Sequence, residues 1–268
     1  MPDKNKKPFT NLFKTDVKDF QPNLWSFIGQ NQTVDILQAI VGKHFNDRID
    51  GCSTYSLPHI HLIGRMGSGR KTLAKCIHSA LGYEPNNFRE ALGATLGMGM
   101  DLFEFFLETE EDSTIFINGC EHLSPYAQTI LYKLINEEIL YVSHPLERTT
   151  VPEPYHNRLF IFSSEHTNGI ISQLLSSIDV QCSMNQYSID ELHQIIYQRC
   201  HFMNLPCGID GMRVIAYRAN GKPSVAVRIL QTAFFFMRNR NAEEIYIDDI
   251  NRAVSYFPKT ELQKKSKT

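Results

Sequence analysis

The chain has 268 residues, of which 42% are hydrophobic and 21% charged, and its formal net charge is −2 at pH 7. This length allows one large domain or two modest ones, with a composition typical of soluble globular proteins. No apolar run approaches the roughly 18–20 residues that span a bilayer, so we expect no membrane insertion. Dedicated nucleic-acid binders carry a basic excess that neutralises phosphates. That excess is missing here, so we expect nucleic-acid binding to be weak or absent.

The beginning of the chain is polar and lacks the apolar region of a signal peptide, so we expect residues 1–20 to be a flexible segment and the protein to be cytoplasmic. Its six cysteines are scattered without a CxxC pair, which fits reduced thiols better than disulfides or zinc. No metal site is expected. His59 and His61 alternate on a predicted strand, but no carboxylate or cysteine stands at a matching spacing.

Helix and strand patterns alternate from residue 21 to residue 186. Apolar residues at helical spacing within residues 22–42 predict an amphipathic helix. Gly93, Gly97 and Gly99 predict a flexible loop. The other predicted elements are buried strands at residues 60–63, 114–117 and 159–162, helices at 72–81 and 125–136, and a hairpin-like stretch at 140–151. This alternation predicts an α/β domain over residues 21–186, a three-layer α/β/α sandwich with a parallel sheet.

The pattern becomes purely helical after Ser188. Ser188 and Glu191 form a capping-box sequence that predicts the start of one helix. Three further helices are predicted at residues 211–219, 223–237 and 248–256. We therefore expect an all-α, four-helix domain at residues 187–258, followed by a basic tail at 259–268.

Residues 64–72 read Gly-Arg-Met-Gly-Ser-Gly-Arg-Lys-Thr, after a strand and at the start of a helix, which is the context of a P-loop. In a P-loop, glycines let backbone N–H groups converge on phosphates at a helix N-terminus. A lysine after the last glycine reaches the phosphates, and the next hydroxyl holds Mg²⁺. Here arginine takes the lysine position, lysine takes the hydroxyl position, and the threonine is displaced by one. The candidate nucleotide-binding residues are Gly64, Gly67, Gly69, Arg70, Lys71 and Thr72; an ordinary strand–turn–helix junction is the alternative.

Three further segments, in the same order, resemble the AAA+ clade of the Holliday-junction motor RuvB and the clamp loaders. Residues 23–30 (Asn-Leu-Trp-Ser-Phe-Ile-Gly-Gln) are similar to the family's box before its first helix. Residues 122–137 resemble the helix after the Walker B strand, and residues 221–230 resemble the lid helix that carries sensor 2. The resemblance covers roughly residues 20–257 and implies an AAA+ P-loop domain with a lid. We expect no room for the winged-helix DNA-binding domain of RuvB.

The departures from the family pattern fall where hydrolysis would occur. The resemblance implies two acids at the end of the Walker B strand, but Asn118 and Gly119 stand there. Glu121 is expected to point elsewhere on the turn. Glu165 falls at the sensor 1 position, where an acid would repel a γ-phosphate, and Ser224 replaces the sensor 2 arginine.

The arginine finger expected shortly after sensor 1 is also missing, since residues 159–198 contain no Arg or Lys. A finger contributes roughly 10³–10⁵ in rate, and a positioned general base roughly 10²–10⁴. The sequence therefore predicts a pseudo-ATPase without catalytic residues, whose cofactor is none or weakly bound ATP or ADP.

The leading functional hypothesis is an adaptor subunit that binds other proteins, including AAA+ proteins in a hetero-oligomer, as the delta-prime-type clamp-loader subunits resemble it in having lost hydrolysis. Two alternatives remain open, namely a RuvB-like, ATP-dependent DNA-processing motor and a nucleotide-binding switch without turnover.

Overall fold

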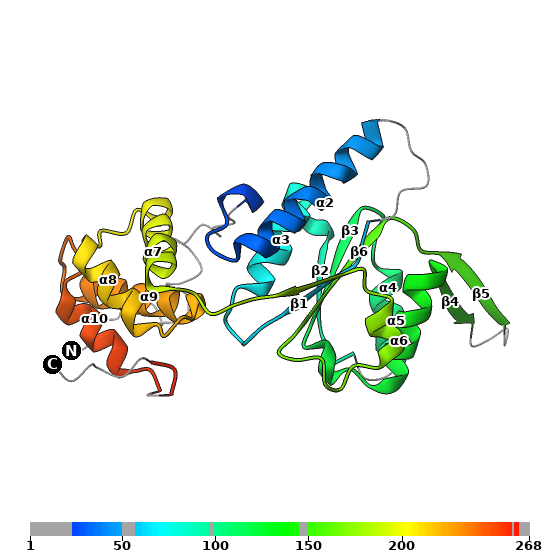
Figure 1. The fold of residues 1–268 in the computed structure, drawn as a ribbon. Helices are drawn as coiled ribbons and strands as arrows, with labels where there is room; N and C mark the ends of the chain where they lie inside the picture. Colours follow the sequence, from blue (N-terminus) through cyan, green and yellow to red (C-terminus); the bar gives the residue numbers. More distant parts are fainter. Residues whose placement is uncertain (1–22, 50–56, 97–98, 145–148, 259, 263–268) are drawn as a thin grey trace, which may run out of the picture. The chain divides into compact units, whose positions relative to one another are not determined.

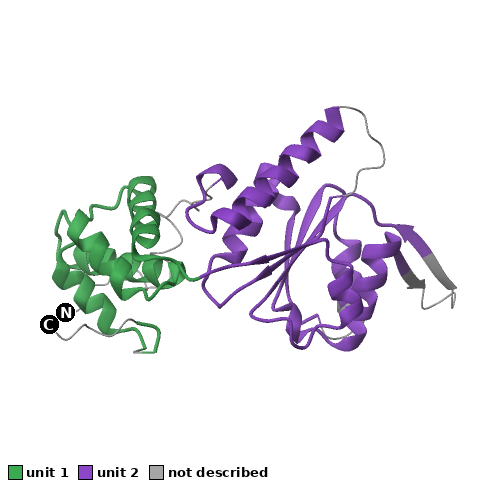
Figure 2. Ribbon diagram, viewed as in Figure 1, with its two compact units in different colours: residues 1–21, 186–268 green, residues 22–185 purple. Residues whose placement is uncertain are grey.

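The computed structural model describes residues 23–49, 57–96, 99–144, 149–258 and 260–262. The chain forms two compact units that divide between Asn185 and Gln186 (Figure 2), and each contains hydrophobic core of its own. None of the helices in these ranges combines the length and the apolar character that a membrane span requires.

The N-terminal unit is built on a five-stranded parallel sheet with the strand order β2-β3-β6-β1-β7. The strands are β1 (Ile60–Ile63), β2 (Phe88–Leu92), β3 (Ser113–Asn118), β6 (Arg158–Ser164) and β7 (Val180–Ser183). The order is not sequential, so each connection crosses over the sheet, as parallel pairing requires. The central strands β1, β3 and β6 are buried and strongly apolar, as expected of strands covered on both faces.

Helices cover both faces of this sheet (Figure 1). The helices α2 (Asn31–Ile49) and α3 (Arg70–Ala80) pack on one face, where Phe116 and Ile161 contribute to the core. The opposite face carries α4 (Gly99–Leu107), α5 (Pro125–Glu137) and α6 (Ser172–Ser176), packed on Ile115, Ile117 and Phe162. Alternate strand residues therefore serve opposite cores, and the predicted three-layer α/β/α fold is confirmed.

The structure adds elements that the sequence patterns did not predict and corrects others. The short strands β2 and β7 were not expected, and α3 begins at Arg70 rather than at residue 72. The prediction of a flexible loop through Gly93, Gly97 and Gly99 is wrong at its end, because α4 begins at Gly99 and buries Leu102 and Phe106; residues 97–98 lie outside the described residues. The hairpin is present as β4 (Ile139–His144) paired with β5 (Thr149–Pro154).

The C-terminal unit contains the four predicted helices within its described residues. They are α7 (Ile189–Met203), α8 (Ile209–Arg218), α9 (Pro223–Asn239) and α10 (Ile247–Ser255). The capping box at the start of α7 is confirmed, because the Ser188 N–H donates to Glu191 Oε2 at 2.7 Å and the Glu191 N–H donates to Ser188 Oγ at 3.2 Å. Residues from all four helices share one apolar core, which Leu192, Ile215 and Ile229 occupy without exposure.

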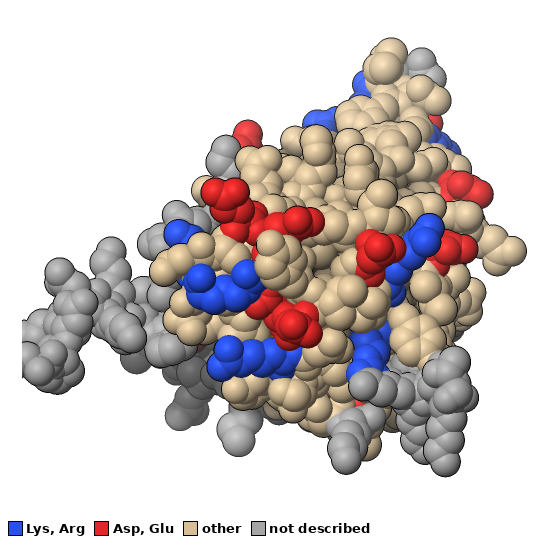
Figure 3. Space-filling view, turned by 90° about the vertical axis from the view of Figure 1, so that its left-hand side faces the viewer, with Lys and Arg blue, Asp and Glu red and all other residues tan. Residues whose placement is uncertain are grey.

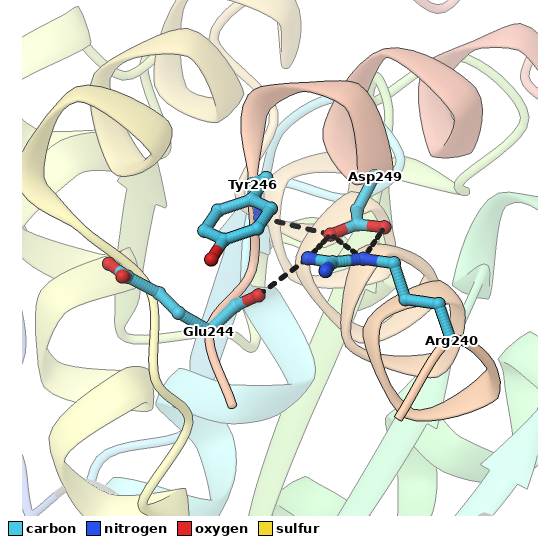
Figure 4. A network of polar contacts seen from close by, with 4 residues as sticks. All are labelled: Arg240, Glu244, Tyr246 and Asp249. Carbon is cyan, nitrogen blue, oxygen red and sulfur yellow. Dashed lines mark hydrogen bonds and ion pairs between the residues drawn. The ribbon is translucent and has the colours of Figure 1, made fainter. Parts of the chain in front are cut away.

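A polar network joins the end of α9 to the start of α10 in this unit (Figure 4). Arg240, at the end of α9, donates from Nε to Asp249 Oδ1 at 3.0 Å and from Nη2 to Asp249 Oδ2 at 2.7 Å. The Tyr246 N–H also donates to Asp249 Oδ2, at 2.9 Å, and the Glu244 carbonyl accepts from Arg240 Nη2 at 2.8 Å. One carboxylate thereby caps the start of α10 and ties it to the preceding helix.

Candidate nucleotide site

Most of the residues singled out by sequence lie at the carboxyl end of the parallel sheet, whereas Ser224 belongs to the C-terminal unit. The P-loop follows β1, Asn118 is the last residue of β3, and Glu165 follows β6. These three strands are neighbours, with Asn118 in register with Ser163 and Ile63 in register with Ser164. The carboxyl edge of a parallel sheet is where open α/β folds bind ligands.

The loop over residues 64–69 has glycine conformations that suit the tight turn of a P-loop. The Gly64 N–H donates to the Ser164 carbonyl at 3.0 Å, which fixes the loop on β6. Gly67 and Gly69 have φ angles of 85° and 95°, in the left-handed region that glycine tolerates best. Gly69 is also the N-cap of α3 and offers no side-chain cap to the helix. The first N–H groups of α3 therefore point out of the helix without a side-chain acceptor at this cap.

The two cations of the motif take different directions. Lys71 is half exposed and forms an ion pair with Glu90 on the edge strand β2. Arg70 is partly buried, and burial lowers the pKa of its guanidinium, while the carboxylates of Glu121 and Glu165 act in the opposite sense. Its Nη1 atom is buried and has no hydrogen-bond partner among the described residues. Thr72 lies partly buried in the first turn of α3. Lysine at the hydroxyl position is thus drawn to the sheet edge.

The end of β3 has no acid and turns at once. Asn118 Oδ1 accepts a hydrogen bond from Ser163 Oγ at 3.0 Å, so this amide is held by the neighbouring strand. Gly119 follows with φ 72° and ψ 48°, and its N–H donates to the Ser163 carbonyl at 2.8 Å. The left-handed backbone at Gly119 starts the short turn η4 (Cys120–His122).

This turn overturns the expectation that Glu121 points away from the site. Its Oε1 accepts a hydrogen bond from the Glu165 N–H at 2.9 Å, directly after β6. Its Oε2 is buried without a hydrogen-bond partner in the described part of the chain. The carboxylate also acts electrostatically on Arg70 and on His61. The physical reason is the left-handed Gly119, which folds η4 back toward the end of β6.

Glu165 makes a contact that sequence reasoning did not foresee. Its Oε1 accepts a hydrogen bond at 2.8 Å from the backbone N–H of Met66, inside the P-loop. A backbone donor has no side-chain signature, so the only available signal was an acid at the sensor 1 position. The structure brings Glu165, Glu121, Arg70 and the loop together at one edge.

Buried, uncharged side chains lie close to these charged groups. His61 is fully buried, and its Nε2 lies 2.8 Å from Ser164 Oγ and 3.8 Å from Cys120 Sγ. Burial lowers the pKa of His61 to about 4 and raises that of the Cys120 thiol to about 12. His59 packs edge-on against Phe160, and its Nδ1 accepts from the Phe160 N–H at 3.3 Å. Both histidines are therefore neutral near pH 7, and the thiol is no nucleophile.

Two further observations bound the chemistry. Within the described ranges, no three His, Cys, Asp or Glu side chains gather as metal ligands. Ser224, the predicted sensor 2 position, is exposed in the first turn of α9, in the C-terminal unit.

Comparison with known proteins gives one family match and a consistent set of similar structures. A family model described as the RuvB AAA lid domain matches residues 187–258. The structure of the Thermotoga maritima RuvB Holliday junction branch migration motor matches with a TM-score of 0.71 at 22% sequence identity, over 88% of this chain and 72% of that chain. A proline-to-glycine mutant of the same RuvB matches with a TM-score of 0.73 at 21% identity, over 88% of this chain and 73% of that chain.

Proposed function

From the premise that the chain has the RuvB AAA+ fold and carries a RuvB AAA lid domain at residues 187–258, we propose that it is a pseudo-ATPase that acts as an adaptor subunit in a larger protein assembly. The observation that carries this proposal is the end of β3. Asn118 and Gly119 stand there in place of acids, and Asn118 is held by Ser163. Hydrolysis needs a carboxylate to hold Mg²⁺ and another to activate water.

Glu121 is the carboxylate best placed to replace the missing acids at the end of β3, and its contacts argue against that role. It accepts from the backbone N–H of Glu165 and acts on Arg70. A general base must reach an attacking water and accept its proton. Glu121 instead holds the turn after β3 against the end of β6, which is a structural task.

The cations support the same proposal. Lys71 is paired with Glu90 at the sheet edge, and Arg70 faces two carboxylates. A finger from within residues 159–198 is excluded by composition, because that range holds no Arg or Lys. The missing acids after β3, the diverted cations and the missing finger together remove the parts that stabilise the transition state of phosphoryl transfer. On this proposal the chain retains a folded AAA+ scaffold that acts by binding other proteins.

The alternatives are weaker. A DNA-processing motor would parallel the Holliday junction branch migration motor RuvB of Thermotoga maritima, but such a motor requires phosphate contacts and turnover. On the face drawn in Figure 3, basic side chains lie beside acidic ones rather than in an area of one sign. A nucleotide switch without turnover requires affinity for ATP or ADP, which the charges around the loop oppose.

The catalytic half of the proposal is tested by ATPase assays of the full chain and of the variant Arg70→Ala, with and without duplex DNA. We expect the same background rate in both proteins. Turnover of ~1 s⁻¹, near the low end of typical enzymes, that disappears in the variant would contradict the pseudo-ATPase.

The adaptor half is tested by purifying the tagged chain from its native source at moderate salt. We expect stoichiometric amounts of other subunits, at least one of them an AAA+ protein. A chain that elutes alone, with a mass of 30.8 kDa, would remove the support for an adaptor.

A further inference from the structure

Glu165, an acidic residue of the chain itself, contacts the P-loop. Glu165 Oε1 lies 2.8 Å from the Met66 nitrogen, and the N–H of Met66 donates to it. In a P-loop the backbone N–H groups are aimed at phosphate oxygens. A carboxylate oxygen has the same charge sign and accepts the same hydrogen bond. The contact therefore has the chemistry of a phosphate contact, made by a side chain.

Two features hold this carboxylate in place. Glu165 begins the segment after β6, and its own N–H is bonded to Glu121 Oε1 at 2.9 Å. The loop is fixed on the same strand, because the Gly64 N–H donates to the Ser164 carbonyl at 3.0 Å. Glu165 and the loop are thus anchored to adjacent atoms of β6, so their contact does not depend on a flexible connection.

Other groups around the loop are buried without partners in the described part of the chain. Ser68 is only 7% exposed, and its Oγ has no hydrogen-bond partner; it folds into the loop toward Gly64. The Nη1 atom of Arg70 is also buried and has no hydrogen-bond partner among the described residues. Buried polar atoms that lack partners are rare in folded proteins and call for an explanation. An anion with several oxygens would supply acceptors to both groups.

We propose that Glu165 occupies the P-loop in place of a phosphate oxygen, and that it is the residue that excludes polyphosphates from this loop. The exclusion has two causes. The carboxylate takes the Met66 N–H, and its negative charge, with that of Glu121, repels a second anion. Without Glu165, the loop backbone, Arg70 and Ser68 form a site for a diphosphate group. This inference concerns binding and is independent of which partner the adaptor serves.

The test measures binding of inorganic pyrophosphate and of ADP to the full chain by calorimetry. A charge-assisted hydrogen bond and a like charge each change affinity by about tenfold or more. We expect no binding to the wild type at millimolar ligand, measurable binding to Glu165→Gln, and binding at least about tenfold tighter to Glu165→Ala. Glutamine keeps an acceptor on Met66 and removes only the charge, whereas alanine frees the donor.

Matched controls separate the loop from general charge effects. Glu110→Gln removes one exposed carboxylate from the same unit and is expected to leave binding at the wild-type level. The double variant Glu165→Ala, Arg70→Ala is expected to lose the gained affinity. Pyrophosphate reports occupancy without turnover, so this result is distinct from the ATPase result.

Hydrogen exchange provides a reading that needs no ligand. The Met66 amide is expected to be protected in the wild type and to exchange about tenfold faster or more in Glu165→Ala, because its acceptor is gone. The inference is overturned if the wild type binds pyrophosphate as tightly as Glu165→Ala. It is also overturned if neither Glu165 variant gains affinity, or if exchange at Met66 is the same in wild type and in Glu165→Ala.

Discussion

Restoring the second acid after β3 is expected to destabilise the protein rather than activate it. Gly119 has φ 72° and ψ 48°, and L residues in the left-handed region cost roughly 1–2 kcal/mol. A Cβ at this position would lie 3.3 Å from Cδ2 of the exposed His122 side chain, which can move aside at little cost. The backbone therefore accounts for most of the loss. We expect Gly119→Ala to lower the free energy of unfolding by about 1–2 kcal/mol, and Gly119→Glu to lower it further through repulsion from Glu121 and Glu165.

Two glycines serve as controls in the same unit. Gly82 has φ 75° with nothing within 4 Å of an added Cβ, so Gly82→Ala isolates the cost of the left-handed backbone. Gly42 lies in α2 with equally open surroundings, and Gly42→Ala is expected to stabilise by about 0.5–1 kcal/mol. Urea denaturation followed by circular dichroism gives the free energies. The reasoning is refuted if Gly119→Ala unfolds like the wild type while Gly82→Ala loses stability, or if Gly119→Glu gains ATPase activity.

The remaining predictions concern buried polar groups of the same unit. Burial lowers the pKa of His59 from 6.5 to about 4, so the unfolded chain binds one more proton than the folded chain between these pH values. The free energy of unfolding should therefore fall by up to about 1.4 kcal/mol per pH unit as the pH decreases from 6.5 toward 4. Thermal unfolding of His59→Gln should show a shallower pH dependence than that of the wild type. An equal dependence in both proteins would contradict this. Thr109 Oγ lies 2.6 Å from both the Phe106 carbonyl and the Tyr155 hydroxyl, so Thr109→Val should lower the free energy of unfolding by about 1–3 kcal/mol. In urea denaturation, the double variant Thr109→Val, Tyr155→Phe should lose less than the sum of the two single variants. Additive losses would show that the two hydroxyls are not coupled.

The fold was predictable where burial imposes a strong pattern. The apolar runs at residues 60–63, 114–117 and 159–162 lie in the central strands, because strands covered on both faces must be apolar throughout. β2 and β7 were missed because edge strands alternate exposure and keep polar residues such as Arg89 and Gln181. α4 was missed because its first residue, Gly99, is a poor helix former, and burial of Leu102 and Phe106 overrides that preference.

The places of several candidate residues along the fold were predictable, but their contacts were not. Order along the chain placed the P-loop, Asn118 and Glu165 after three strands of a parallel sheet. The contact of Glu165 with the Met66 N–H involves a backbone donor and 99 positions of separation, which no local pattern encodes. The direction of Glu121 depended on the φ angle of Gly119, which a sequence alone leaves open.

The charges at the start of α3 have a consequence for how the protein responds to the metabolic state of the cell. A helix N-terminus carries about half a positive charge, and Arg70 and Lys71 add to it in the first turn. Glu90, Glu121 and Glu165 supply the counter-charge from the chain itself. An enzyme that relies on a nucleotide for this neutralisation gains stability by RT ln(1 + [L]/Kd), so its folding follows the supply of ligand. If the proposed exclusion of nucleotides holds, we expect this chain, which carries its own counter-ions, to keep the same stability whether ATP is abundant or depleted.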